Sequence, residues 1–365
     1  MRVQKKPFLD IFEDVSRGNM KTLQKDFLEE GNIPIVDQGQ KLIAGYTNDR
    51  ASICKAKLPV IIFGDHTKII KYVDFEFAIG ADGVKVLTTK EKGNVKYFYH
   101  ALKFARIPDA GYSRHYKFLK EIEVCFPPLM EQKRIAAILD AAEALRAKRR
   151  QILKELDTFL QATFLHMFGD PVTNPKGWEH KLLGEVTTIE APMVDPRKEE
   201  YRDLLHYGPD RIGKNTGELL PALTAKEDRL VSGKFLCSEK DILYSKIRPY
   251  LNKVALVREK CLCSADVYPV QPNEKFITKE FLWVLLRSKA FLDYVAGFSR
   301  RANIPKINRE QFAGYLSFLP PLALQQQFAA IVESVERQKV AMKAHLAELD
   351  DLFGSLQQRA FNGEL

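Results

Sequence analysis

Two stretches of the chain begin alike: FPPLMEQKRIAAILD at 126–140 and LPPLALQQQFAAIVE at 319–333. Each places a Pro-Pro pair directly before apolar residues with the period of a helix. Proline is tolerated in the first turn of a helix, because the N–H group that it lacks would have no partner there. Both stretches therefore predict the start of a helix, and their likeness predicts an internal repeat.

The likeness continues well beyond the two helix starts. Residues 127–170 align with 320–363 without a gap, at an offset of 193, and thirteen of the 44 pairs are identical. Chance would give about two or three identical pairs. Gly169 with Pro171, and Asn362 with Gly363, are typical of helix ends. The chain is therefore predicted to contain two copies of one long helix.

Apolar residues recur every seven positions in both predicted helices, a spacing that buries a seam against another helix. The residues expected in the seam are Ile138, Leu145, Ile152, Leu156, Phe159, Phe328, Val335, Met342, Leu349 and Leu356. A helix of roughly 37 residues is about 55 Å long, which is too long to bury its seam on one small domain. Because a globular segment lies between the copies, we expect the helices to pair as an antiparallel coiled coil. Packing of each helix on a different partner is the alternative.

A globular segment precedes each helix. The predicted domains are a module at 1–126, a helix at 127–170, a second module at 171–319 and a second helix at 320–365. The predicted strands are PVIIFG (59–64), AIGADGVKVL (78–87), DILYSKI (241–247) and CSADVYPV (263–270), and the predicted helices span 95–107 and 279–297. The fold class is therefore α+β, with two mixed α/β modules. Weak likenesses between the modules, at offsets that grow from 171 to 184, indicate a shared scaffold with different loops.

The net charge of +9 lies mainly in the two modules. Residues 1–126 contain 21 basic and 16 acidic residues, and residues 171–319 contain 24 and 19. An equal excess suits two modules that approach a polyanion such as nucleic acid, although an excess of this size is also ordinary. The five cysteines have no framework spacing, and no run of 18 apolar residues occurs. We therefore expect reduced thiols, no membrane span and a cytoplasmic protein.

The sequence lacks the common catalytic signatures. It contains no P-loop, no GxGxxG, no HExxH and no CxxC, and its seven histidines are scattered singly. Pro108-Asp109 followed by Glu131-Gln132-Lys133 mimics a pattern of metal-dependent nucleases, in which two carboxylates and a lysine bind Mg²⁺ and activate water. Glu131 opens the predicted helix, however, and its repeat position holds Leu324. We expect no metal or cofactor on this chain. A stand-alone nuclease and a coiled-coil interaction protein without a nucleic-acid role are the alternatives.

The order of module, helix, module and related helix resembles the specificity subunit of Type I restriction–modification enzymes. The resemblance covers essentially the whole chain. It is carried by PPLMEQKRIAAILD and PPLALQQQFAAIVE, and supported by EGNIPIVDQG (30–39), GWEHKLLGEV (177–186) and SRRANIPKINREQFAGYLSFLPP (299–321). The first module departs from the second in lacking the tryptophan seen at Trp178.

The resemblance implies that each module is a target recognition domain for one half of a bipartite, gapped site in double-stranded DNA. It implies a coiled coil that sets the distance between the two half-sites. We expect the nonspecific spacer between them to be about 5–8 base pairs. The chain would be non-catalytic and would dock two methyltransferase subunits, which use S-adenosylmethionine, and restriction subunits, which use ATP. These cofactors and Mg²⁺ are expected on the partner subunits, in a system of defence against foreign DNA.

Bases are distinguished in the major groove by polar side chains on a rigid scaffold. We expect DNA contacts from polar and basic residues in loops beside the predicted strands. In the first module these are Gln38, Gln40, Lys41, His66, Thr67, Lys68, Tyr112, Ser113, Arg114 and His115. In the second they are Lys214, Asn215, Lys246, Arg248, Tyr250, Asn252, Arg300, Arg301 and Asn303. Arginine is expected on guanine and Asn or Gln on adenine, whereas many of the others would contact only phosphate.

Overall fold

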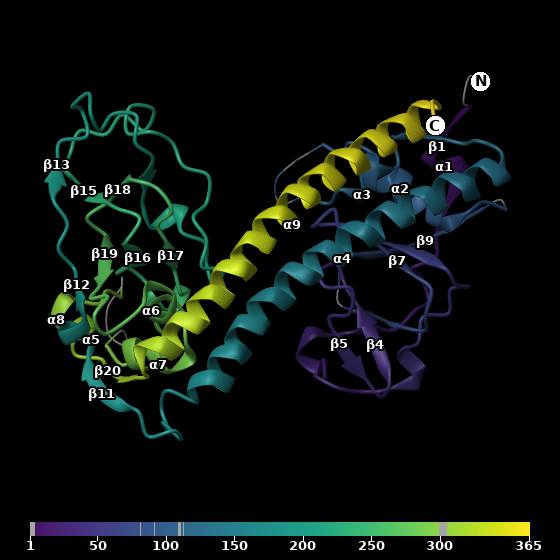
Figure 1. Cartoon of the computed structure of the whole chain (residues 1–365). Coiled ribbons are helices and arrows are strands. Elements are labelled where there is room, and N and C mark those ends of the chain that lie inside the picture. Colours follow the sequence, from purple (N-terminus) through teal and green to yellow (C-terminus); the bar gives the residue numbers. More distant parts are fainter. Residues whose placement is uncertain (1–3, 81, 91, 109–110, 112, 299–304) are drawn as a thin grey trace. The chain divides into compact units, whose positions relative to one another are not determined.

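The computed structural model describes residues 4–365 except 81, 91, 109–110, 112 and 299–304 (Figure 1). The chain divides into two compact units, one made of 1–150 with 344–365 and the other of 151–343. Each unit contains one module and part of both long helices, α4 (Leu129–Phe168) and α9 (Leu322–Asn362). The four-part division of the chain, which separates modules from helices, stays a prediction.

The first unit contains two four-stranded sheets. One is antiparallel, with the order β2 (Phe12–Asp14), β9 (Val84–Thr89), β6 (Val60–Gly64) and β7 (Ile70–Val73). The other has the order β3 (Lys21–Thr22), β8 (Ala78–Gly80), β4 (Ile33–Val36) and β5 (Gly45–Thr47), with β8 parallel to both neighbours. A separate pair joins β1 (Lys5–Pro7) to β10 (Glu123–Cys125). The short helices are α1 (Phe8–Ile11), α2 (Val95–Phe104), α3 (Tyr116–Leu119), η1 (Gln24–Asp26) and η2 (Arg50–Ser52).

The second unit also contains two four-stranded sheets. One is antiparallel, with the order β12 (Thr187–Thr188), β19 (Val267–Pro272), β16 (Ile242–Ser245) and β17 (Val254–Leu256). The other has the order β13 (Met193–Val194), β15 (Lys234–Cys237), β18 (Cys261–Cys263) and β14 (His206–Tyr207). A separate pair joins β11 (Glu179–Leu182) to β20 (Leu316–Leu319). The short helices are α5 (Leu183–Val186), α6 (Lys279–Leu286), α7 (Lys289–Ala296), α8 (Arg309–Ala313), η3 (Pro209–Arg211) and η4 (Pro249–Leu251).

The antiparallel sheets of the two units have the same topology. In each, the first strand along the chain forms an edge and pairs with the last strand, which also pairs with the second. The short helix α1 comes directly before the antiparallel sheet of the first unit, and α5 comes directly before that of the second. Phe8 therefore corresponds to Leu183, an offset of 175 residues, whereas the sequence comparison aligns this region at an offset of 171. The order of the other four-stranded sheet differs between the units. The modules therefore share a framework and differ in the structure attached to it.

Three predicted elements are divided in the structure. AIGADGVKVL forms β8 and β9, which belong to different sheets, and the left-handed Gly83 (φ 85°) lies between them. CSADVYPV likewise contains the end of β18 and the start of β19. The helix predicted over 279–297 consists of α6 and α7, because the Ser288 side chain accepts a hydrogen bond from the N–H of Phe291 and caps a new helix.

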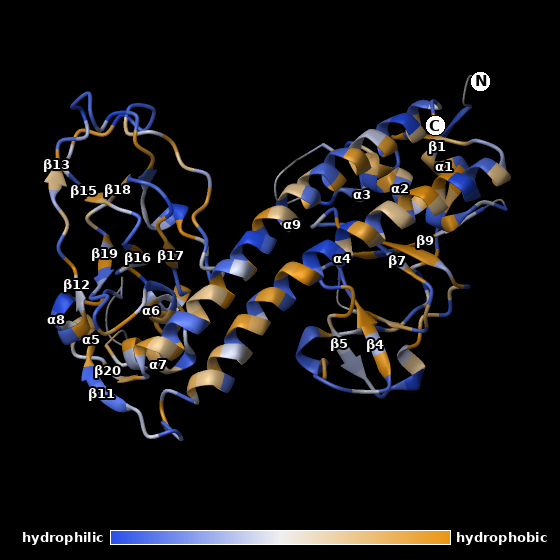
Figure 2. Ribbon diagram, viewed as in Figure 1, coloured by the Kyte–Doolittle hydropathy of each residue, from blue (hydrophilic) through white to orange (hydrophobic). Residues whose placement is uncertain are grey.

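Both long helices begin and end where the sequence predicts. Each begins directly after its Pro-Pro pair, and each ends before a left-handed glycine, Gly169 (φ 86°) after α4 and Gly363 (φ 78°) after α9. In the first unit the beginning of α4 packs on the end of α9, and in the second unit the end of α4 packs on the beginning of α9. The predicted antiparallel coiled coil is confirmed. Figure 2 shows apolar residues recurring along both helices between hydrophilic ones.

The buried residues of the helix pair differ in part from the predicted seam. The apolar ones are Ile135, Ala136, Leu139, Ala142, Phe353, Ala360 and Phe361 in the first unit, and Leu160, Phe164, Phe168, Phe328, Val332 and Val335 in the second. The predicted residues Ile138, Ile152, Leu156, Met342, Leu349 and Leu356 are half-buried. Leu145 and Phe159 are 56% and 50% exposed, so the structure places them outside the seam. Along this row of α4, half-buried and exposed residues alternate, whereas the neighbouring positions Leu139 and Leu160 are buried, so the seam runs beside the predicted row.

The duplicated glutamine of the Pro-Pro phrase attaches each module to its helix. Gln132 donates from Nε2 to the carbonyl of Pro127 (2.8 Å) and accepts from the N–H of Asn94 at Oε1 (2.9 Å). Gln325 donates to the carbonyl of Pro320 (2.8 Å) and accepts from the N–H of Thr278 (3.0 Å). Asn94 and Thr278 are the N-cap residues of α2 and α6, so both modules are held by the same contact.

Candidate nucleic-acid interface

Three loops of the first unit meet at Gln38. Its Nε2 donates to the carbonyl of Asp82 (3.1 Å), and its Oε1 accepts from the backbone N–H of His66 (3.2 Å). The hydroxyl of Thr67 donates to the carbonyl of Gln38 at 2.6 Å. The Gln38 side chain, predicted to contact DNA, therefore joins these loops to one another. Thr67 remains exposed at the surface that they form.

A buried lysine holds one of these loops. Lys71 on β7 is 5% exposed, and its ammonium donates to the carbonyls of Asp37 (2.7 Å) and Lys41 (2.5 Å). Burial lowers the pKa of Lys71, and the carboxylate of Asp37 acts against this shift. The loop that carries the exposed residues Gln40 and Lys41 is thereby fixed. Lys71 was not among the predicted residues, because it occupies a strand rather than a loop.

The segment after α2 contributes less to the surface than predicted. His115 is 1% exposed, its N–H donates to the carbonyl of Asp65 (2.7 Å), and its Nδ1 lies 3.1 Å from the same oxygen. The structure thus corrects the expectation of a DNA contact at His115, since tertiary packing buries the ring. Arg114 is exposed, Ser113 and Lys68 are half-buried, and Tyr112 lies outside the described residues.

A histidine–aspartate pair links α2 to α4 in the first unit. His100 is 1% exposed, and its Nε2 lies 2.8 Å from Oδ1 of Asp140. Burial lowers the pKa of His100, although the hydrogen bond with Asp140 acts in the opposite direction. Burial therefore favours the neutral form of the ring in this pair.

The predicted contacts of the second unit gather around η4. Arg248 and Tyr250 are exposed, and Tyr250 keeps 54% of its surface accessible. Lys214 and Asn215 are exposed as well, and the N–H of Asn215 donates to the carbonyl of Asn252 (3.3 Å). Asn252 itself is 8% exposed, so it supports this turn rather than presenting its side chain.

The other predicted residues of this unit are less available. Lys246 is half-buried, and its ammonium lies 3.6 Å from the carboxylate of Asp266. Arg300, Arg301 and Asn303 lie outside the described residues. Of the nine predicted contacts in this unit, four are therefore exposed in the described structure: Lys214, Asn215, Arg248 and Tyr250.

A largely buried ion network, in which Arg211 and Asp228 are half-buried, supports the loop between β14 and β15. Arg211 donates from its two terminal nitrogens to the two carboxylate oxygens of Asp228, at 2.8 Å each. Nδ1 of His206 lies 2.9 Å from the same carboxylate. Burial lowers the pKa of His206, and the hydrogen bond with Asp228 opposes the shift. A bidentate arginine–carboxylate pair fixes both partners in one orientation.

Glu218 connects the loop that carries Lys214 and Asn215 to α9. Its carboxylate lies 2.6 Å from the ammonium of Lys343 and 3.9 Å from that of Lys339. Lys339 is 2% exposed and also binds Asp157 of α4 (2.9 Å) and Glu336 of α9 (3.0 Å). Three carboxylates thus surround one buried ammonium where the second module meets its helices.

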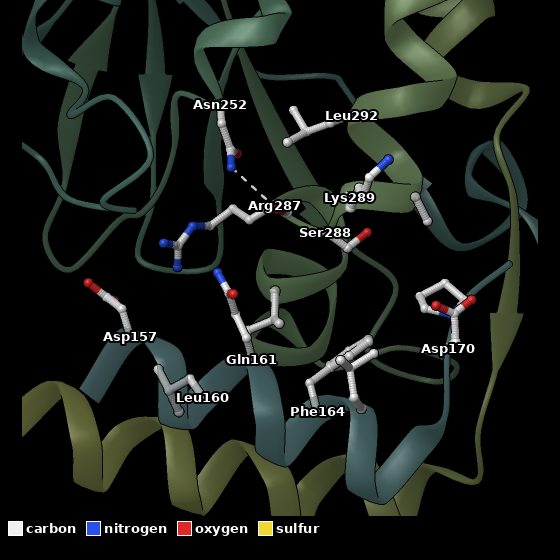
Figure 3. A pocket seen from close by; sticks show the side chains of 14 residues that line it. Asp157, Leu160, Gln161, Phe164, Asp170, Asn252, Arg287, Ser288, Lys289 and Leu292 are labelled. Atoms are coloured by element: carbon white, nitrogen blue, oxygen red, sulfur yellow. Dashed lines mark hydrogen bonds between the residues drawn. The ribbon is translucent and has the colours of Figure 1, made fainter. Parts of the chain in front are cut away.

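A cavity of about 440 Å³ lies in the second unit between α4 and the junction of α6 with α7 (Figure 3). Leu160 and Phe164 of α4 line one side, and Arg287, Ser288 and Lys289 line the other. Arg287 stacks over the ring of Trp283, with its guanidinium carbon 4.4 Å from the ring centroid. The cavity therefore borders Asn252, the residue that supports the exposed turn at η4.

The alternative of a nuclease finds no support in the described chain. Asp109 lies outside the described residues, and the carboxylate of Glu131 is held by Arg134 at 2.5 Å. Within 4–365, apart from the undescribed positions, no group of three or more His, Cys, Asp or Glu side chains is arranged to hold a metal ion. No helix among the described residues is long and apolar enough to cross a membrane.

Comparison with known proteins assigns both halves of the chain to one kind of domain. A family model described as the Type I restriction modification DNA specificity domain matches residues 3–158 and 175–350. The Type I restriction enzyme EcoDI specificity subunit of Escherichia coli is 28% identical over 288 residues, which are 68% of this chain and 63% of that protein. The EcoR124I/EcoR124II specificity subunit of Escherichia coli is 25% identical over 324 residues, which are 79% of each protein. The chain thus spans less than two thirds of the EcoDI subunit.

Among solved structures, a Type-I restriction-modification system S subunit from M. genitalium has a similar fold. The alignment covers 98% of this chain and 96% of that chain, with a TM-score of 0.64 and 16% sequence identity. At this identity the likeness concerns the fold alone.

Proposed function

Because the chain belongs to the Type I restriction modification DNA specificity family, with one matching domain in each half, we propose that it is the DNA-specificity subunit of a Type I restriction–modification system. The duplicated match carries this proposal. It is supported by the common topology of the two antiparallel sheets and by the equal basic excess of the two modules. Two related modules with different loops suit a site whose two halves differ in sequence.

Each module is proposed to read one half-site through side chains that its loops expose. The candidates are Gln40, Lys41, Thr67 and Arg114 in the first unit and Lys214, Asn215, Arg248 and Tyr250 in the second. Lys71 and the pair of Arg211 with Asp228 fix the loops of their units. Such rigid support is what discrimination among bases requires.

The long helices are proposed to fix the spacing of the two half-sites. With 40 and 41 residues, α4 and α9 are each about 60 Å long. Gln132 and Gln325 attach the modules to them by the same pair of hydrogen bonds. We therefore expect a gapped site with an unspecified spacer of about 5–8 base pairs.

Two methyltransferase subunits are proposed as partners, with S-adenosylmethionine bound on them, and restriction subunits would bring ATP and Mg²⁺. The internal repeat supports the binding of two methyltransferase subunits. Phe159 of α4 and Leu352 of α9 occupy equivalent positions at the offset of 193, and each is 50% exposed. An exposed glutamate, Glu155 or Glu348, precedes each by four residues. Two equal surfaces of this kind suit two copies of one partner.

Selection from a pool of randomised duplexes tests the proposal. The full chain, assembled with the methyltransferase of its host, is expected to enrich one bipartite sequence with two specified blocks. The affinity of the complex for DNA should fall steeply as the salt concentration rises, because binding to phosphates releases counterions from the DNA. Enrichment of no sequence, or of a single continuous block, would refute the proposal.

A further inference from the structure

Three residues with an unusual backbone conformation lie together in the second unit. Among the described residues six non-glycine residues have positive φ, and three of them are Asn215 (61°), Arg248 (50°) and Asn252 (49°). Arg248 and Asn252 flank η4, and the N–H of Asn215 donates to the carbonyl of Asn252. Such residues persist only where their surroundings hold them, and they gather at ligand-binding sites.

Arg287 holds this turn from the side of α6. Its carbonyl accepts a hydrogen bond from Nδ2 of Asn252 (3.3 Å), which Figure 3 shows as a dashed line. Its guanidinium donates to the carbonyl of Asn215 (3.2 Å) and stacks over Trp283. One residue therefore fixes both left-handed asparagines, and with them the position of η4.

The residue type at 248 does not suit its backbone conformation. Asparagine tolerates the left-handed region, because its short side chain can bond locally, whereas arginine gains no such compensation. The Arg248 side chain is exposed, and among the described residues it makes neither a hydrogen bond nor an ion pair. The N–H of Arg248 donates to the carbonyl of Pro305 (2.7 Å), so its backbone is fixed while its side chain has no partner among the described residues of the unit. The fold alone would be served better by glycine.

An exposed guanidinium on a fixed turn has one preferred partner among the bases. Arginine donates two parallel hydrogen bonds to O6 and N7 of guanine in the major groove, and lysine cannot reproduce this fork. Tyr250, two residues along the chain, and Lys214, next to Asn215, are exposed as well and suit contacts with the DNA backbone. We propose that Arg248 is a specificity-determining residue of the second module and reads a guanine in its half-site. This inference rests on the proposed function.

The duplex selection, repeated with variants of the full chain in its methyltransferase complex, tests this assignment. Arg248→Ala removes the side chain, Arg248→Lys keeps the charge without the fork, and Arg248→Gly removes the side chain while relieving the backbone. Lys240→Ala, an exposed lysine of the same unit, is the control for net charge. All three Arg248 variants should lose the preference for guanine at one position of one block, by about 10- to 100-fold. At every other position the Arg248 variants should select the same bases as the native chain. The control variant Lys240→Ala should select the native sequence throughout.

Two results would overturn the assignment. If Arg248→Lys selects the native sequence while Arg248→Ala weakens binding to all duplexes equally, Arg248 contacts phosphate. If all variants select the native sequence, Arg248 takes no part in reading. Both outcomes require that the native chain selects a bipartite site, so they are distinct from failure of the proposed function, in which the native chain selects none. The glycine variant keeps the test valid if the alanine variant does not fold.

Discussion

Nε of Arg146 on α4 lies 2.5 Å from Oδ1 of Asp350 on α9, within the first unit. The 193-residue repeat places Lys339 and Asp157 in the same relation within the second unit, where their atoms are 2.9 Å apart. Each copy of the duplicated helix thus supplies the cation to one unit and the aspartate to the other. The duplication preserved an interhelical ion pair, although arginine and lysine replace one another in it.

The two ion pairs should differ in their contribution to stability. Lys339→Met leaves three carboxylates facing one another around a buried site, which we expect to cost about 2–4 kcal/mol. Arg146→Met should cost about 1 kcal/mol or less, because Asp350 keeps a second cation, Arg150, at 3.1 Å. Thermal unfolding followed by circular dichroism measures the difference. A shift of the midpoint that is as large for Arg146→Met as for Lys339→Met would contradict this account.

The repeated glutamine should be equally important in both units. Gln132→Met and Gln325→Met each leave the N–H of a helix N-cap without its buried acceptor, at a cost of about 1–3 kcal/mol. Gln326→Met, at the exposed neighbouring position, is the matched control and should leave the unfolding midpoint unchanged. If the control destabilises the chain as much as Gln325→Met does, the hydrogen bonds are not the reason for the repeated residue.

The starts and the pairing of the two long helices could be predicted from the sequence. The Pro-Pro phrase predicted both helix starts and the pairing of the copies, because proline and apolar period act locally. The exposed positions of Leu145 and Phe159 could not be predicted, since the face of a long helix that is buried depends on the partner's position. The polar residues Gln38, His115 and Asn252 were predicted at the surface from their type and their position in loops beside predicted strands. Their use inside the modules depends on loops that meet only in the folded chain.

Stability should fall as the pH is lowered from 7.5 to 5.5. Burial holds the pKa values of His100 and His206 below the ordinary value. The unfolded chain, with histidine pKa values of about 6.5, therefore binds more protons in this range, so acid favours unfolding. The double variant His100→Gln/His206→Gln should show a flatter dependence of the unfolding midpoint on pH. His180→Gln, which changes an exposed histidine, should keep the native slope. A native slope in the double variant would exclude these two residues as its source.

The two equivalent apolar positions should each serve one methyltransferase copy. Phe159→Ser is expected to reduce the complex from two bound methyltransferases to one, as is Leu352→Ser, and the double variant should bind none. Native mass spectrometry of the assembled complex gives the number directly. Val172→Ser, another exposed apolar position outside the helices, is the control. Two bound copies in the double variant would rule out these positions as docking sites.

Mapping of methylated bases across the host genome, with and without this chain, tests the central claim most directly. We expect one bipartite motif, with a spacer of about 5–8 unspecified base pairs, that is methylated when the chain is present and unmethylated when the chain is deleted. An unchanged pattern of methylation after deletion, or the loss of only an ungapped motif, would contradict the account.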